Sequence, residues 1–134
     1  MTSKVEYKGN LRTVCTHLKS GSEFITDAPT DNNGKGEAFS PTDTVATALA
    51  SCMITVMGIK ARDLEVDLTG TTAEVTKTMS ANPRRISKIE VTINFPLNPD
   101  DKTKKILEHT ANTCPVHQSL HPEIEKVITF HWNR

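Results

Sequence analysis

One segment constrains the fold of this chain more than any other, because residues 44–59 form a run of 16 without a charged side chain. Just before it, Ser40 can cap a helix, Pro41 suits the first helical position, and Asp43 lies three residues after the cap. The pattern predicts a helix from about Pro41 to Arg62. A helix that is apolar or small on every face must be covered on all sides. The chain predicts few other helices, so we expect a partner subunit to supply part of that cover.

Length and composition narrow the classes of protein that remain. The 134 residues predict a single domain over residues 1–134, and 16 basic against 16 acidic residues give zero net charge, which argues against a nucleic-acid binder. The uncharged run is shorter than the roughly 20 residues of a membrane helix, and the N-terminus has no secretory signal pattern. We therefore expect a cytoplasmic protein that binds neither nucleic acid nor a membrane. The odd number of cysteines, three, argues against a disulfide framework.

The rest of the chain predicts an α+β fold, with an antiparallel sheet around the long buried helix. Residues 4–28 are typical of a hairpin whose turn is Lys19–Ser22. Further strands are expected at 63–68, 72–79, 86–95 and 124–132. A second helix is expected to begin at Pro99-Asp100-Asp101, with Ile106, Leu107, Thr110 and Ala111 as its buried stripe.

Cys52 lies near the middle of the predicted uncharged helix. Free cysteine is among the most buried residue types, so the local pattern favours a structural thiol. Cys52 is about three turns from Pro41, whereas a helix dipole acts mainly over the first turn. If Cys52 is a nucleophile, its thiolate needs a cation or a hydrogen-bond donor from elsewhere in the protein.

Cys114 precedes Pro115 and is therefore expected to end the second helix. Pro115 can open a short helix over residues 116–120, which would put Cys114 at the cap, where backbone N–H groups favour a thiolate. The alternative is a cysteine packed under a loop, and local physics does not separate the two. Cys15, on a predicted strand, has no special neighbour in sequence and is expected to be a structural thiol.

A metal site is an alternative use of this part of the chain, because His109, Cys114, His117 and His121 fall within 13 residues. Their spacing matches no standard zinc pattern and there is no C-x-x-C pair, so surface or hydrogen-bonded histidines are the favoured interpretation. Phosphate-binding, dinucleotide-binding and serine-hydrolase motifs are also missing from the sequence. We expect neither a metal nor a cofactor.

Three segments together resemble the OsmC/Ohr family: Phe39–Asp43, Ala48–Met53, and Thr113–His117, which begins about 60 residues further on. The resemblance extends over nearly the whole chain, including Ile128–Trp132 as a final strand. It implies an intertwined homodimer in which sheets wrap two central helices, and an activity that needs no cofactor. The implied homodimer agrees with the separate expectation that a partner subunit covers the uncharged helix.

The resemblance also implies a chemistry, the thiol-based reduction of organic hydroperoxides in defence against oxidative stress. Cys52 would be the peroxidatic thiol that becomes a sulfenic acid, and Cys114 the resolving thiol that forms a disulfide with it. An external dithiol would then reduce the disulfide. The alternative is a redox-sensing or small-molecule-binding protein of the same fold with little peroxidase turnover.

Two positions depart from the peroxidase branches of that family, so the chain most resembles a less characterised branch. Where those branches carry an arginine in the first hairpin turn, this chain has Lys19, which supplies charge without a planar fork. Where they carry a glutamate after the helix-opening proline, this chain has Thr42, and either Glu37 or Asp43 is a candidate for the missing carboxylate. Further candidates for the activating cation are Arg12 and His17.

Overall fold

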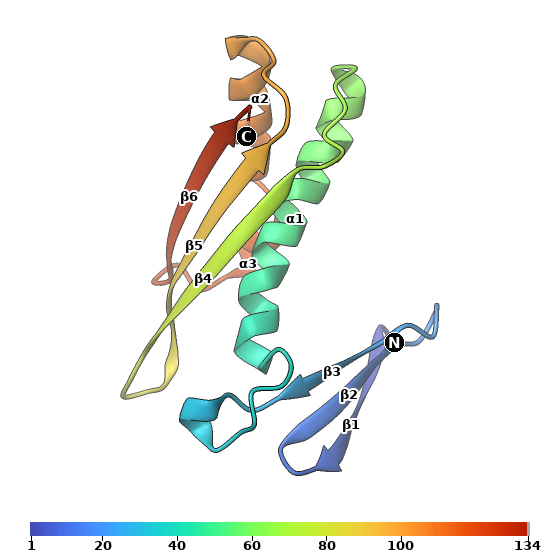
Figure 1. Ribbon diagram of the computed structural model, residues 1–134, viewed down its shortest axis with the longest axis vertical. Helices are drawn as coiled ribbons and strands as arrows, with labels where there is room; N and C mark the ends of the chain where they lie inside the picture. Colours follow the sequence, from blue (N-terminus) through green and yellow to red (C-terminus); the bar gives the residue numbers. More distant parts are fainter. Residues whose placement is uncertain (134) are drawn as a thin grey trace. The chain divides into compact units, whose positions relative to one another are not determined.

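The computed structural model describes residues 1–133 and shows an α+β fold with two three-stranded sheets (Figure 1). Contacts within the chain divide it into two compact units, one formed by residues 1–45 and one that begins at Ala46. The predicted fold class is confirmed at this level. A single domain over residues 1–134 stays a prediction.

The N-terminal unit is an antiparallel meander of β1 (Ser3–Gly9), β2 (Arg12–His17) and β3 (Glu23–Asp27). The predicted turn between residues 19 and 22 is confirmed, since β2 and β3 flank it. The prediction of one continuous strand before that turn is wrong. The chain reverses at Asn10, where φ is 54°, and forms two strands in place of one. Gly and Asn tolerate the left-handed backbone of a tight hairpin, so Gly9-Asn10 was the signal for this extra turn.

The sheet of the C-terminal unit contains β4 (Thr72–Ser80), β5 (Arg85–Phe95) and β6 (Glu125–Trp132) in that order. β4 and β5 pair antiparallel, as predicted, but β5 and β6 pair parallel. The prediction of an antiparallel sheet is therefore wrong for this pair. Parallel neighbours need a long crossover, and the helical segment between β5 and β6 supplies it.

Helix α1 (Pro41–Asp63) begins where the sequence predicts and ends one residue later than predicted. Its start is a reciprocal capping box, because the Asp43 N–H donates to Ser40 Oγ at 3.1 Å and the Ser40 N–H donates to Asp43 Oδ2 at 2.9 Å. The prediction of a strand at residues 63–68 is wrong. Helix α1 ends there in a turn, in which Glu65 has a φ of 56°.

The crossover from β5 to β6 contains α2 (Asp101–Ala111) and α3 (Pro115–Ser119). Asp100 caps α2, accepting a hydrogen bond from the Thr103 N–H at 2.8 Å. In the predicted stripe of α2, Leu107 and Ala111 are buried and the other two members are partly buried. The short segment η1 (Thr30–Asn32) lies in the loop before α1.

One hydrophobic core joins α1, α2 and the sheet of the C-terminal unit. Alternate residues of β5 are buried, as its sequence pattern predicts. Phe95 at the end of β5 stacks on Trp132 of β6, with ring centroids 3.8 Å apart. The members of the core that are wholly buried include Leu49, Met53, Met57, Ile89, Val91, Ile93, Phe95, Leu107, Ala111 and Cys114.

Only one side of α1 takes part in this core. Val45 is 40% exposed and Ile59 is 61% exposed, so one chain does not cover the helix on every face. By length and hydropathy alone α1 could cross a membrane, but a soluble protein's core helix passes the same test.

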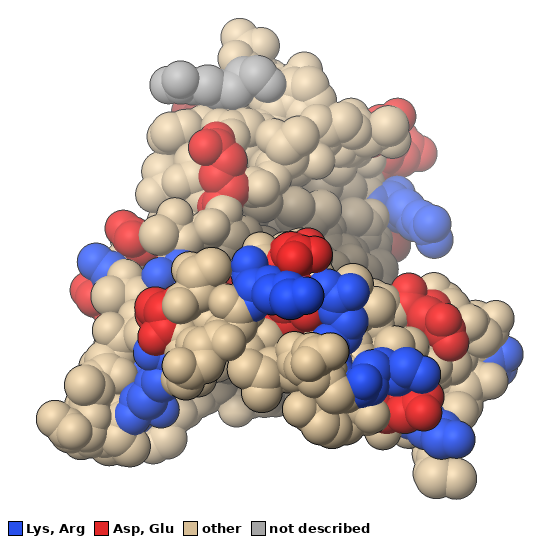
Figure 2. All heavy atoms as spheres, turned by 60° about the horizontal axis from the view of Figure 1, so that its bottom comes forward, with Lys and Arg blue, Asp and Glu red and all other residues tan. Residues whose placement is uncertain are grey.

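Charged side chains of both signs are interspersed on the face shown in Figure 2, as the equal numbers of basic and acidic residues lead one to expect.

The buried face of β5 should dominate the stability of the C-terminal unit. Ile93 is fully buried, so Ile93→Ala should lower the free energy of unfolding by about 2–5 kcal/mol in urea titrations. Val127, on β6 and 39% exposed, is the control, and Val127→Ala should cost about 1 kcal/mol or less. A similar decrease in the free energy of unfolding for both variants would contradict this placement of the core.

Candidate functional site

The candidate site is a pair of cysteines far apart in sequence, Cys52 on α1 and Cys114 at the start of α3. The two side chains lie in the C-terminal unit near enough for Cys52 to contribute to the raised pKa of the Cys114 thiol. Both are free thiols, so this is the reduced form of the pair.

Cys114 is the N-cap residue of α3, as one of the two sequence interpretations proposed. Its extended backbone, with ψ of 148°, follows from Pro115, which disfavours helical geometry in the residue before it. The His117 N–H donates a hydrogen bond to Cys114 Sγ at 3.3 Å. Sequence analysis did not identify this donor, although a cap cysteine followed by a helix implies a backbone N–H three residues on.

The environment of Cys114 favours the protonated thiol. The residue is 0% exposed, and burial raises the pKa of its thiol more strongly than the His117 N–H lowers it. The neighbouring sulfur of Cys52 adds to the rise in the pKa of Cys114. The cap hydrogen bond does favour a thiolate, as one sequence interpretation proposed, but burial has the larger effect on the pKa of Cys114.

Cys52 has a different environment, although it packs against the same core. It is only partly buried, so water reaches one side of its residue. Its position within α1 puts it far from the N–H groups of the first helical turn.

The other three predicted site residues lie in the N-terminal unit or in the part of α1 that belongs to it. Lys19 is exposed in the turn between β2 and β3. The carboxylate of Glu37 is exposed and lies 3.7 Å from Arg12 Nη2. Asp43 takes part in the capping box that begins α1.

Arg12 and His17, the further candidates for a cation, have partners within the same unit. Arg12 binds the carboxylate of Asp27 with two hydrogen bonds, of 2.7 and 2.8 Å, and this pair lowers the pKa of the Asp27 carboxyl. Nδ1 of His17 is 2.6 Å from the Ser20 hydroxyl. Sequence analysis missed Asp27, a buried acid at the end of β3 that Arg12 requires as its partner.

The histidines near Cys114 do not form a metal site in the described part of the chain, where no group of three or more His, Cys, Asp or Glu is arranged to hold an ion. His121 Nδ1 accepts a hydrogen bond from the Glu123 N–H at 3.1 Å. His117 is half-buried, and burial together with Lys126 lowers the pKa of its imidazole. His109 is exposed in the last turn of α2.

Cys15, the third cysteine, is half-buried on β2, and its sulfur lies 3.8 Å from the Thr13 hydroxyl. This placement agrees with the expected structural thiol.

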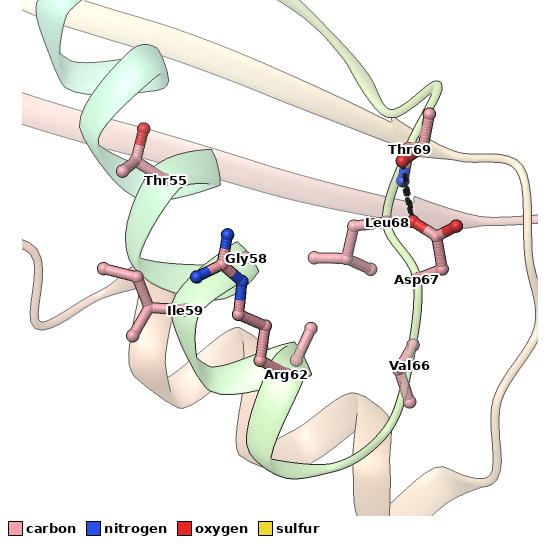
Figure 3. A pocket seen from close by; sticks show the side chains of 9 residues that line it. Thr55, Gly58, Ile59, Arg62, Val66, Asp67, Leu68 and Thr69 are labelled. Atoms are coloured by element: carbon pink, nitrogen blue, oxygen red, sulfur yellow. Dashed lines mark hydrogen bonds between the residues drawn. The ribbon is translucent and has the colours of Figure 1, made fainter.

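A cavity of about 380 Å³ lies at the C-terminal end of α1 (Figure 3). Its lining comes from the last turns of α1 and from the segment before β4, and it includes Arg62 and Leu68 but no cysteine. Gly58 lines it too, and a Cβ at that position would meet no atom within 4 Å.

The sequence matches the OsmC-like protein family over residues 34–128. The chain belongs to the OsmC-like family. The matched segment contains both cysteines of the candidate site. A search among curated proteins gives no match.

Solved structures agree with the family assignment. A crystal structure from Psychrobacter arcticus 273-4, described as an osmotic stress induced and detoxification response protein, has 60% identity and a TM-score of 0.95, and the alignment covers 98% of this chain and 96% of that one. An organic hydroperoxide resistance protein OsmC from Legionella pneumophila has 13% identity, a TM-score of 0.76 and coverages of 98% and 97%. At that identity the second likeness shows that the OsmC-like fold is shared, and nothing further.

The unequal environments of the two cysteines predict an order of alkylation. In the folded protein, iodoacetamide should modify Cys52 well before Cys114, because alkylation needs both access and a thiolate, and Cys114 has neither. Mass spectrometry of peptides after timed quenching measures the two rates.

Protein unfolded in urea is the control for this measurement, and there the two cysteines should react at similar rates. Faster modification of Cys114 than of Cys52 in the folded protein would contradict the described site.

Proposed function

We propose that this OsmC-like protein is a cysteine-dependent peroxidase that reduces organic hydroperoxides in defence against oxidative stress. The observation that supports the proposal is that two free cysteines far apart in sequence, Cys52 and Cys114, share one core, where Cys52 influences the pKa of Cys114. A protein of the same fold is described as an organic hydroperoxide resistance protein, and we take the substrate class of the proposal from that description. The surrounding core is apolar, which suits an alkyl hydroperoxide.

The two cysteines have different roles in this proposal because they differ in burial. Cys52 is partly exposed and is the sulfur that a peroxide can reach, so it is the peroxidatic residue. Cys114 is fully buried and remains protonated, so it is the resolving residue. A peroxidatic thiol must be a thiolate at the moment of attack, whereas a resolving thiol can wait as the neutral form.

In the first step, the Cys52 thiolate attacks the distal oxygen of the hydroperoxide and the O–O bond breaks. The organic fragment leaves as an alkoxide, takes up a proton and becomes an alcohol, while Cys52 becomes a sulfenic acid. In the second step, the Cys114 sulfur attacks the Cys52 sulfur. Hydroxide leaves with the proton of the Cys114 thiol as water, and a disulfide forms.

An external dithiol completes the cycle. One of its sulfurs attacks the disulfide at Cys52, since Cys114 is fully buried, and Cys114 leaves and is reprotonated. The second sulfur of the dithiol then releases Cys52 as a thiolate, and the reductant leaves as a disulfide. We propose no metal or cofactor in this cycle.

Lys19 is the proposed cation near the reactive sulfur, with Glu37 or Asp43 as the carboxylate that orients it. Of the two carboxylates, Asp43 already accepts the Ser40 N–H at the start of α1. Glu37 is the more exposed and has only a 3.7 Å contact with Arg12, so it is freer to change partner. Exposed charges of this kind are screened by salt, which limits the contribution of Lys19.

The reaction can be tested by mixing the purified protein with cumene hydroperoxide and a dithiol and following peroxide consumption. Wild-type protein should turn over many times, and Cys52→Ser should lose turnover by more than about 100-fold, because the attacking sulfur is gone. Cys114→Ser should react once and then slow, because no disulfide forms. The matched control is Cys15→Ser, which should keep wild-type turnover.

Different outcomes separate the proposal from its alternative. Oxidation of one equivalent of protein without turnover would favour a redox-sensing or small-molecule-binding protein. Turnover that persists in Cys52→Ser would contradict the proposal.

We also propose that the protein is a homodimer in which a second copy covers the apolar surfaces that one chain leaves exposed. In residues 1–45 no hydrophobic side chain is buried, whereas Phe24 is 53% and Phe39 is 54% exposed. Ile59 on α1 is similarly exposed. An exposed apolar surface of this kind marks an interface between proteins. A cytoplasmic location agrees with this account and stays a prediction.

Sedimentation equilibrium at low micromolar concentration should show a dimer whose dissociation coincides with unfolding. Ile59→Glu should weaken the dimer, because it puts a charge into an apolar interface, and Thr76→Glu on the exposed side of β4 is the control. A stable, folded monomer at that concentration would contradict the proposal.

A further inference from the structure

A second cavity, of about 150 Å³, lies in the N-terminal unit beside the turn from β1 to β2. At Gly9, in that turn, a Cβ would meet no atom within 4 Å, so the space beside the turn is open. No apolar side chain lines the cavity, which is formed by Lys8, Gly9, Asn10, Arg12, Asp27 and Lys35. Four of these side chains can donate hydrogen bonds, which suits a ligand that supplies acceptors.

Asp27 is the one acid among the six lining residues, and its acceptors are already in use. Its side chain is 4% exposed and accepts hydrogen bonds from Nε and Nη2 of Arg12, at 2.7 and 2.8 Å. The Glu37 N–H donates to the same carboxylate at 3.1 Å. The Arg12 hydrogen bonds lower the pKa of the Asp27 carboxyl, so Asp27 is ionised at neutral pH and holds Arg12 in place.

The guanidinium of Arg12 is therefore oriented with one nitrogen to spare. The two hydrogen bonds to Asp27 use Nε and Nη2, and the N–H groups of Nη1 can donate to another acceptor. The Arg12 side chain is 35% exposed, so a small ligand can reach it. A side chain that is already held in one orientation loses less conformational entropy on binding than a mobile one does.

Two lysines give the cavity an excess of positive charge. Among the lining residues, three basic side chains stand against one acid, Asp27. The ammonium of Lys8 is 3.6 Å from the carboxylate of Glu6, but both side chains are at least half exposed, and such pairs are weak. Lys35 acts on Asp27 through its charge. Glu37, 3.7 Å from Nη2 of Arg12, is also exposed, so neither glutamate cancels the charge of the cavity in the way that a buried acid does.

We propose that this cavity binds a phosphate group, as inorganic phosphate or as a phosphate monoester. Nη1 of Arg12 donates to one oxygen, and the ammonium groups of Lys8 and Lys35 neutralise the charge, which is roughly −1.5 to −2 for a monoester at pH 7. The oxygens of a phosphate group point in several directions, and the donors come from β1, β2 and the loop before α1. A carboxylate carries one charge and presents two oxygens on one edge, so it should bind more weakly. The site lies outside the unit that contains Cys52 and Cys114 and does not rest on the proposed peroxidase activity.

Isothermal titration calorimetry of the whole protein at low ionic strength, with inorganic phosphate and with glycerol 3-phosphate, measures the affinity. We expect one bound anion per chain and a dissociation constant of about 1 mM or lower. Lys8→Gln and Lys35→Gln should each weaken binding by about tenfold, because each removes a charge-assisted contact from an exposed residue. Lys102→Gln, an exposed lysine on α2, is the matched control and should stay within about twofold of wild type, because a distant charge is screened.

Two further measurements locate the anion. In ¹H–¹⁵N correlation spectra, phosphate should shift the backbone amide signals of Gly9 and Asn10. Arg12→Lys keeps the charge but removes the fork, and should also weaken binding by about tenfold. Circular dichroism establishes that this variant is folded, and if it is not, the two lysine variants and the amide shifts decide. Tighter binding of one of the two phosphates would support the inference and identify the source of the phosphate group.

Three results would overturn the inference. One is the absence of binding heat and of amide shifts at Gly9 and Asn10 with both phosphates. Another is an equal loss of affinity in Lys102→Gln and Lys35→Gln, which would mean that the anion responds to overall charge. The third is acetate binding as tightly as phosphate, which would mean that the cavity does not distinguish the two shapes. None of these measurements uses a peroxide, so peroxidase turnover and phosphate binding are judged separately.

Discussion

The hydrogen bond from the His117 N–H to the Cys114 sulfur is the interaction on which the candidate site depends. It holds a wholly buried thiol at the start of α3, in the same core against which the partly buried Cys52 of α1 packs. The two sulfurs differ because one is desolvated and the other is not. Burial raises the pKa of the first, and this difference is the basis for the separate roles in the proposed peroxidase cycle.

The geometry of the site follows from the crossover between β5 and β6. Parallel strands require a long connection, and here it contains two helices separated by a break at Cys114-Pro115. Proline forces the residue before it out of the helical region, which gives the cysteine its cap position. An antiparallel β5–β6 pair could be joined by a short turn, and such a turn would leave no crossover to bring Cys114 against α1.

Local sequence signals predicted the elements that have strong caps or clean alternation, including α1, α2 and β5. They also placed Cys114 at a helix cap. They failed where long-range pairing decides, as in the parallel β6, and where a turn depends on backbone conformation, as at Asn10 and Glu65. They left the two interpretations of Cys114 open, because burial, which has the largest effect on its pKa, is a property of the packed core that no short segment shows.

Lys19 stands where, by the resemblance of the sequence, peroxidase branches of the family carry an arginine. An arginine fork can hold a thiolate and a carboxylate at fixed angles, whereas an exposed lysine is a mobile charge that salt screens. The proposed contribution of Lys19 to the Cys52 thiolate is therefore weaker than that of a guanidinium and depends more on ionic strength.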